Sequence, residues 1–317
     1  MFSVKPATNN VALATAENAL KKKGRSFYWA RRLLGPVHAS RATRLYGFCR
    51  HLDDLADEAT SVASARVKLS AASQDIAAGV SSDPVIRDGI ELMQECRISP
   101  VIAVELVKGL LSDLDLVRCP DEAALLQYCY RVAGTVGVMM CGVLDVSDPK
   151  AFAHAIDLGI AMQLTNICRD IAEDAAANRR YLPASLIGDL GPEELISPSL
   201  ASRPRLRQGV ETLLNRADRH YASGEMGLAY LPLRARSGIL VASRVYRAIG
   251  TRLRAQGSIF WEGRIMVSDR RKAGLTVGAL ISASGQGFFW RKPFGHDASL
   301  HDALFGLPYI KLGHAIR

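Results

Sequence analysis

Residues 46–58 read YGFCRHLDDLADE, and residues 163–174 read QLTNICRDIAED. In the first stretch apolar residues recur at helical spacing, and about 100° of rotation per residue brings most polar side chains onto one face. That face carries Tyr46, Arg50, Asp53, Asp54 and Asp57. Aspartate is a poor helix former, and like charges four residues apart repel each other. We therefore expect a cationic partner on this face.

The second stretch repeats the pattern with amides in addition to carboxylates. Gln163, Asn166, Asp170 and Asp174 follow the spacing i, i+3, i+7, i+11, which places them on one helix face. Each of these side chains offers an oxygen. Magnesium prefers oxygen ligands and commonly joins one or two carboxylates to substrate phosphates. Two such helices facing each other would form a cleft that holds Mg²⁺ ions against a diphosphate.

A simpler explanation is an exposed acidic helix face paired with Arg50 or Arg169. One D-x-x-x-D pattern is expected roughly once by chance in a chain of this length, so either copy alone is weak evidence. Two copies, each inside an otherwise apolar helix and each with Arg and amide residues nearby, favour the metal cleft.

The rest of the chain also predicts helices. Breakers such as Gly35-Pro36, Asp83-Pro84 and Ser99-Pro100 separate apolar segments of helical period, and β-strand alternation is hard to find. The longest predicted helices cover 41–59, 121–143, 150–177, 205–229, 233–256 and 267–284. The expected fold class is all-α, with a single domain over 16–290. The ends, 1–15 and the tail 291–317, are expected to be loosely held.

Composition is that of a soluble globular protein, with 317 residues of which 49% are hydrophobic and 22% are charged. The net charge is 40 − 31 = +9, and residues 203–272 hold fifteen Arg or Lys against five acidic residues. This basic region predicts an anionic partner, such as nucleic acid, acidic lipid or a phosphorylated small molecule. A nucleic-acid role would require interleaved aromatic residues or a known motif, and neither is evident, so no nucleic-acid partner is expected.

The six cysteines stand singly, without the paired spacing of a zinc site or the density of a disulfide scaffold. They indicate reduced thiols and a cytoplasmic protein. The N-terminal residues have no apolar core followed by a cleavage site. The longest uncharged run, Gly274 to Trp290, carries four glycines and several polar residues, so we interpret it as a packed helix with its tail, not as a membrane span.

Four stretches identify the family that this chain resembles. They are YGFCRHLDDLADE, YCYRVAGTVG, QLTNICRDIAEDAAANRRYLP and GLAYLPLRARSGILVASRVYRAIG. In order and spacing they closely resemble the squalene and phytoene synthase family, most closely its bacterial phytoene synthases, from about Gly24 to Gln286. The resemblance implies an all-α isoprenoid synthase fold, a single helical domain around a central cavity. It also implies head-to-head condensation of two prenyl diphosphates with Mg²⁺ or Mn²⁺.

The resemblance further implies roles for individual residues. The aspartate motifs match Asp53, Asp57, Asp170 and Asp174, which are implied to be catalytic and metal-binding, with Asp54 and Asn166 as additional metal ligands. Arg50 and Tyr128 are implied to be catalytic. The residues implied to bind substrate are Ser26, Arg50, Gln163, Asn166, Tyr246, Arg264, Val132 and Val136.

Val132, Val136 and Met139 or Met140 form an apolar stripe that has two interpretations. On periodicity alone it is an ordinary buried face, with Gly134 and Gly137 allowing close helix contact. The resemblance favours a second interpretation, in which the stripe walls a hydrocarbon tunnel.

The expected activity is condensation of two geranylgeranyl diphosphates through prephytoene diphosphate to phytoene, in carotenoid biosynthesis and without NADPH. The alternatives are a squalene or dehydrosqualene synthase that uses farnesyl diphosphate, and a non-catalytic relative that acts as an assembly factor. The expected partners are a prenyl diphosphate and, peripherally, a membrane surface. The oligomeric state is left open.

Overall fold

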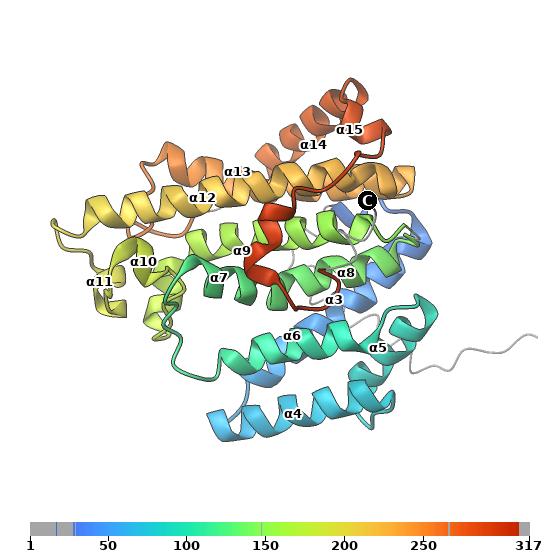
Figure 1. The fold of residues 1–317 in the computed structure, drawn as a ribbon, viewed down its shortest axis with the longest axis horizontal. Coiled ribbons are helices and arrows are strands. Elements are labelled where there is room, and N and C mark those ends of the chain that lie inside the picture. The colour runs from blue at the N-terminus through green and yellow to red at the C-terminus, as the bar shows by residue number, and fades with distance from the viewer. Residues whose placement is uncertain (1–16, 18–27, 29, 147, 266, 311–317) are drawn as a thin grey trace, which may run out of the picture.

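The computed structural model describes residues 17, 28, 30–146, 148–265 and 267–310, and these form helices joined by short loops (Figure 1). Within this part of the chain there is no named strand, and the only strand-like pairing is an isolated bridge between Arg118 and Arg180. The predicted all-α class is confirmed. The α-helices are α3 (Pro36–Asp57), α4 (Val62–Ala78), α5 (Pro84–Glu95), α6 (Pro100–Ser112), α7 (Glu122–Cys129), α8 (Thr135–Val143), α9 (Ala151–Ala176), α10 (Ala184–Ile187), α11 (Pro192–Ile196), α12 (Arg203–Met226), α13 (Leu233–Ala255), α14 (Asp269–Ser284) and α15 (Gly287–Trp290).

The breakers seen in the sequence begin these helices. Pro36 and Pro100 each stand in the first turn of their helix, where a missing N–H costs nothing. In α5 Pro84 follows Asp83, whose side chain caps the helix by accepting hydrogen bonds from the N–H groups of Val85 and Ile86. A proline in the first turn, in α5 together with an aspartate cap, therefore marks the start of each of these helices.

The predicted helix over 121–143 is continuous in direction but has a widened turn in the middle. It consists of α7, the π-helical turn η1 (Tyr130–Gly134) and α8. Two glycines let it approach α9 closely. A Cβ on Gly137 would lie 2.2 Å from the carbonyl oxygen of Ala155, and one on Gly159 would lie 2.3 Å from that of Ala133. Larger residues at either position would push the two helices apart.

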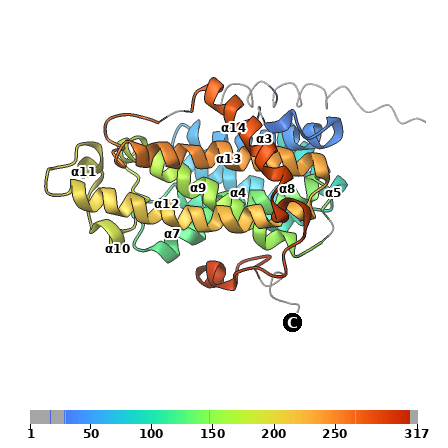
Figure 2. The ribbon, with the colours of Figure 1, turned by 90° about the horizontal axis from the view of Figure 1, so that it is seen from above.

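Helix α9 runs through the middle of the molecule, with α8 on one side and α12 and α13 on another (Figures 1 and 2). Its buried positions include Ile160, Leu164, Ile167 and Ile171. The second aspartate motif is thus carried by a helix that packs against neighbours on several sides, which fixes its position. Helix α14 packs on the outer side of α13, and α15 follows it (Figure 1). None of the helices in the described ranges is both long and apolar enough to cross a membrane.

The described part of the tail, residues 291–310, is packed and not loose, contrary to expectation. Leu300 and Leu304, on the 3₁₀ helix η3 (Ala298–Leu304), are buried, as is Ile310, and the side-chain amide of Gln127 donates to the carbonyl of Ala303 at 2.9 Å. Scattered apolar residues in a short tail carry no periodic signal, which is why the sequence did not predict this docking. The division of the chain at residues 16 and 290 stays a prediction.

Candidate active site

An apolar cavity of about 310 Å³ lies between α3, α8, α9 and α13. At one end it is lined by Tyr46 from α3, by Gln163 and Asn166 from α9, and by Tyr246 from α13. Toward the other end α9 contributes small or apolar residues down to Ala151, with His154 as the exception. The cavity therefore has a polar end beside the two aspartate motifs and an apolar body.

The first aspartate motif surrounds one arginine. Arg50 contacts Asp54 directly, and its guanidinium nitrogens lie 4.0 Å from Asp53 Oδ2 and 3.9 Å from Asp57 Oδ2. This is the cationic partner that the sequence predicted. The neighbouring His51 pairs with Asp83, at 2.9 Å, and not with the motif aspartates.

The second motif contains a side-chain amide oxygen, beside its carboxylates, that has no hydrogen-bond partner among the described residues. Asn166, Asp170 and Asp174 stand four residues apart on α9, and Asn166 Oδ1 is buried with no hydrogen-bond partner among the described residues. A buried oxygen without a donor is costly unless a ligand satisfies it. Asp170 is held by Arg169 and by Arg264, whose Nε lies 3.2 Å from Asp170 Oδ1. Oxygens of this kind suit a divalent cation such as Mg²⁺ or Mn²⁺.

In each motif, the surroundings of one aspartate disfavour the ionised form of its carboxyl group. Burial, with the neighbouring Asp57, Asp54 and Asp113, raises the pKa of Asp53 to about 7 against the lowering effect of Arg50. Burial and Asp170, followed by Asp113 and Glu173, raise the pKa of Asp174 to about 7 although Arg179 opposes this. Asp113 contributes to both shifts, so it lies within electrostatic reach of both helices. Cations placed here would remove the repulsion.

Asp113 is a site residue that our sequence reasoning missed. It follows α6, and its two carboxylate oxygens accept hydrogen bonds from the hydroxyls of Tyr128 at 2.8 Å and Tyr181 at 2.7 Å. The two phenol rings stack with centroids 4.8 Å apart. Burial raises the pKa of Asp113 against these two hydrogen bonds and the charge of Arg179. Arg179 and Tyr181 follow the second motif closely in the sequence. That proximity was the only feature of the sequence that could have indicated a place in the site for these two residues.

Tyr128 therefore belongs to this polar group and is not among the residues that line the apolar cavity. Val132, Val136 and Met140 do line it, whereas Met139 is buried in the core. The stripe is thus divided between the cavity wall and the core, and its role as the wall of a hydrocarbon tunnel stays a prediction. Ser26 lies outside the described residues.

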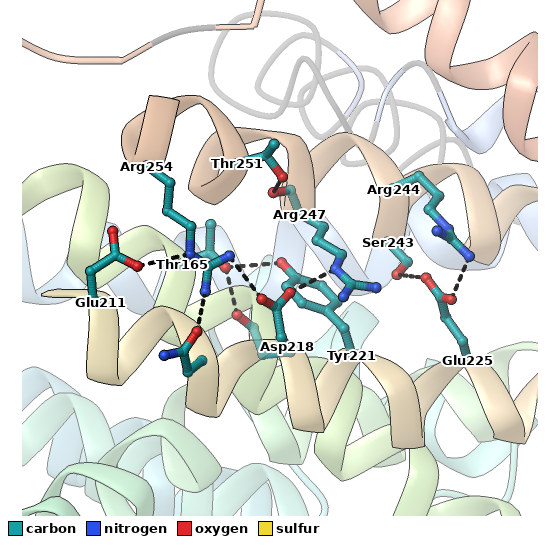
Figure 3. Close-up of polar contacts among 12 residues, drawn as sticks. Thr165, Glu211, Asp218, Tyr221, Glu225, Ser243, Arg244, Arg247, Thr251 and Arg254 are labelled. Carbon is teal, nitrogen blue, oxygen red and sulfur yellow. Dashed lines mark hydrogen bonds and ion pairs between the residues drawn. The ribbon is translucent and has the colours of Figure 1, made fainter. Parts of the chain in front are cut away.

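Much of the basic region forms ion pairs between α12 and α13 (Figure 3). Arg254 contacts Glu211 and Asp218, Arg247 contacts Asp218 at 2.7 Å, and Arg244 contacts Glu225 at 2.7 Å. These arginines are engaged in ion pairs that join two helices. Fewer arginines are therefore available to bind an anion than the count of basic residues in 203–272 suggests. Arg264 is different because it reaches Asp170 and Glu173 at the second motif.

Comparison with known proteins gives the family. The squalene/phytoene synthase family model matches residues 20–271. The chain belongs to the squalene/phytoene synthase family. It is 34% identical to a phytoene synthase of Pseudescherichia vulneris over 86% of this chain and 90% of that protein. It is also 34% identical to a 15-cis-phytoene synthase of a Paracoccus strain, over 82% and 88%.

Solved structures in this family share the fold. A dehydrosqualene synthase in complex with a ligand superposes with a TM-score of 0.76 at 26% identity, covering 88% of this chain and 98% of that one. A squalene synthase from Alicyclobacillus acidocaldarius gives 0.69 at 19% identity, covering 80% and 97%. The expected isoprenoid synthase fold is confirmed.

Proposed function

We propose that this chain is a phytoene synthase that condenses two geranylgeranyl diphosphates head to head, through prephytoene diphosphate, to phytoene with release of diphosphate. The observation that carries the proposal is the cavity, which begins at the amides beside the two aspartate motifs and continues as an apolar channel along α9. The similarity to phytoene synthases over most of the chain supports it. Such a product would serve carotenoid biosynthesis.

The length of the channel suits a 20-carbon tail. From Asn166 to Ala151 the lining follows α9 for fifteen residues, which at about 1.5 Å per residue is about 22 Å. Carbon–carbon bonds of about 1.5 Å advance an extended chain by about 1.25 Å each, so the fifteen bonds along the sixteen-carbon backbone of a geranylgeranyl tail span about 19 Å. A farnesyl tail, with eleven bonds along its twelve backbone carbons, would span about 14 Å and leave the far end empty.

The polar end supports separation of diphosphate from an allylic cation. The residues proposed to hold Mg²⁺ or Mn²⁺ are Asp53, Asp54 and Asp57 on α3 with Asn166, Asp170 and Asp174 on α9. When bound, these ions neutralise the leaving diphosphate as a Lewis acid.

The chain's own residues supply the remaining chemistry. Arg50 and Arg264 are placed to add positive charge at the leaving group, while Gln163 and Asn166 orient the diphosphate end. The apolar body of the cavity excludes water from the carbocation. The ring of Tyr246, on the cavity wall, offers an aromatic face to a cation, whereas Tyr128 would act from the polar group around Asp113. Loss of a proton to released diphosphate or to a side chain completes the reaction, so no NADPH is expected.

A farnesyl-using squalene or dehydrosqualene synthase is the second candidate, because a dehydrosqualene synthase is among the structural neighbours. A non-catalytic assembly factor would be expected to lose motif aspartates, and all four are present. Incubating the purified protein with Mg²⁺ and each diphosphate separately, then identifying the hydrocarbon, distinguishes the three.

We also propose a cytoplasmic protein that attaches reversibly to membrane surfaces, since its proposed substrate tails and product are apolar. Exposed apolar side chains on α14, Val277 and Leu280, lie near the exposed Arg270 and Arg271 on the same helix, a combination suited to anionic lipid. Flotation with anionic vesicles should show binding at low salt that weakens as salt rises.

A further inference from the structure

Asp157 is a fully buried carboxylate on α9, thirteen residues before Asp170 of the second aspartate motif. Its Oδ1 lies 2.8 Å from Nδ1 of His220 on α12 and 3.0 Å from Nε2 of His301 in the tail. Its Oδ2 lies 2.6 Å from Nε2 of His296 and also accepts from the hydroxyl of Ser223. An ionised carboxylate can only accept, so all four groups donate to it.

The Asp157 carboxylate accepts four hydrogen bonds, two on each oxygen. Burial alone would raise the pKa of Asp157, but the bonds from His220, His296 and His301 bring it well below its usual range. On the far sides of two rings, His220 Nε2 and His301 Nδ1 are buried without a hydrogen-bond partner among the described residues. Atoms of Asp157, His296 and His301 lie within 4.8 Å of one another, but the acceptor positions of the carboxylate are already filled.

The cluster fastens the tail to the core, since Asp157 belongs to α9 and His220 to α12 while His296 and His301 lie in the tail. It also lies directly behind a residue that lines the cavity. His154, one turn before Asp157 on α9, is part of the lining.

The His154 ring is held by its surroundings. Its Nδ1 lies 2.8 Å from the carbonyl of Ser223, and the ring of His296 meets it edge-on with centroids 5.3 Å apart. A Cβ on Gly227 would lie 2.3 Å from the Cβ of His154, so α9 and η2 (Gly227–Tyr230) are in close contact at this point. The tail residue His296 thus backs a residue of the cavity wall.

For a tail that starts beside Asn166, His154 lies at a depth that only the longer tail reaches. It is twelve residues from Asn166, or about 18 Å along the helix axis. An extended 15-carbon tail of about 14 Å ends before that depth, and an extended 20-carbon tail of about 19 Å ends beyond it. Contacts at His154 are therefore made by the fourth isoprene unit and not by the first three.

We propose that Asp157 is a positioning residue that, through His296 and His301, presses the tail against His154 and so sets the preference for a 20-carbon over a 15-carbon tail. The proposal rests on the proposed function for its choice of substrates. A wall that is held in place makes contact with the terminal isoprene unit. A wall that can move loses that contact and leaves the shorter tail unaffected.

The test compares His301→Leu, which removes a donor to Asp157, with His301→Gln, whose side-chain amide can still donate from a similar position. His296→Ala removes the group behind His154. The matched control is Arg219→Ala, which breaks the exposed pair between Arg219 and Asp297 in the same tail without touching the cluster. Dissociation constants for unreactive thiodiphosphate analogues of both tail lengths measure the preference without requiring turnover. Hydrogen exchange over residues 298–304 reports whether the tail has loosened.

The expected result is a fall of about tenfold in the preference for the 20-carbon analogue in His301→Leu and His296→Ala, the size that a contact with a few methylene groups carries. Faster exchange in the tail should accompany it, while His301→Gln and Arg219→Ala stay near the wild type. An unchanged preference in a variant whose tail exchanges faster would overturn the proposal, as would an undisturbed tail in both disruptive variants. Failure of the proposed function would show separately, as the absence of a 40-carbon product from the wild type.

Discussion

Replacing Asp174 by Asn should stabilise the metal-free protein while abolishing its activity. The side chain is half-buried, and its pKa of about 7 lies well above the ordinary value of 3.8 because burial and Asp170 disfavour the anion. A raised pKa means that the folded chain holds this proton more tightly than the unfolded chain. The ionised carboxylate therefore destabilises the fold, and the penalty grows as pH rises from about 4 to about 7.

The size of the effect follows from that shift. About three pKa units at about 1.4 kcal/mol each give an upper limit of about 4 kcal/mol. Solvent screening of a half-exposed group reduces this to about 2 kcal/mol above pH 7. For a protein of this size that corresponds to a rise of about 4 °C in melting temperature at pH 8. Near pH 4 the difference should vanish, because the wild-type carboxyl is then protonated in the folded chain.

Differential scanning calorimetry in EDTA at pH 4.5, 6 and 8 measures the stability difference. Glu58→Gln is the matched control, because Glu58 is an exposed acidic residue adjacent to the first motif. Adding Mg²⁺ and diphosphate should then stabilise the wild type more than Asp174→Asn, since only the wild type keeps the ligand. A metal-free variant that is less stable than the wild type at pH 8, or one that gains as much from Mg²⁺ and diphosphate, would refute the reasoning.

Three further predictions concern the same cavity. Asp53→Ala and Asp170→Ala should each lower turnover by at least about a hundredfold with helix content intact, and near-normal activity in the folded double variant would reject the metal cleft. Lowering the pH from 8 to 6 should weaken the apparent Mg²⁺ affinity, because a carboxyl group must lose its proton before it binds the ion. Asp53 and Asp174 should each contribute a factor of about ten, since both have a pKa of about 7. Titration of activity with Mg²⁺ at each pH checks this. Val132→Phe or Val136→Phe should raise farnesyl use relative to geranylgeranyl use, because an overpacked channel obstructs the longer tail first, whereas equal losses with both substrates would contradict a channel role.

The sequence predicted the helices that carry the chemistry because their signals are local. Residues 150–177 and 233–256 have long apolar periods ended by breakers, and they agree with α9 and α13 within a residue or two. The first aspartate helix begins five residues earlier than expected, at Pro36, because a proline that seemed to end a segment instead stands in the first turn.

The parts that the sequence did not predict depend on contacts between distant residues. Asp113 joins Tyr128 and Tyr181, which are 15 and 68 positions away, and no helical period links them. The docking of the tail on Asp157 similarly joins residues separated by 139 and 144 positions. Single polar residues such as these acquire a role only when the fold brings their partners together.

The most direct test of the central claim is the identity of the hydrocarbon made from geranylgeranyl diphosphate. Purified protein with Mg²⁺ and this substrate alone, without NADPH, should yield a 40-carbon hydrocarbon with a central conjugated triene, and it should use farnesyl diphosphate less well. Mass spectrometry gives the carbon number, and the ultraviolet spectrum reports the triene. Efficient formation of a 30-carbon product with no 40-carbon product would contradict the proposed substrate. No hydrocarbon from either diphosphate, with a folded protein and Mg²⁺ present, would contradict the proposed reaction.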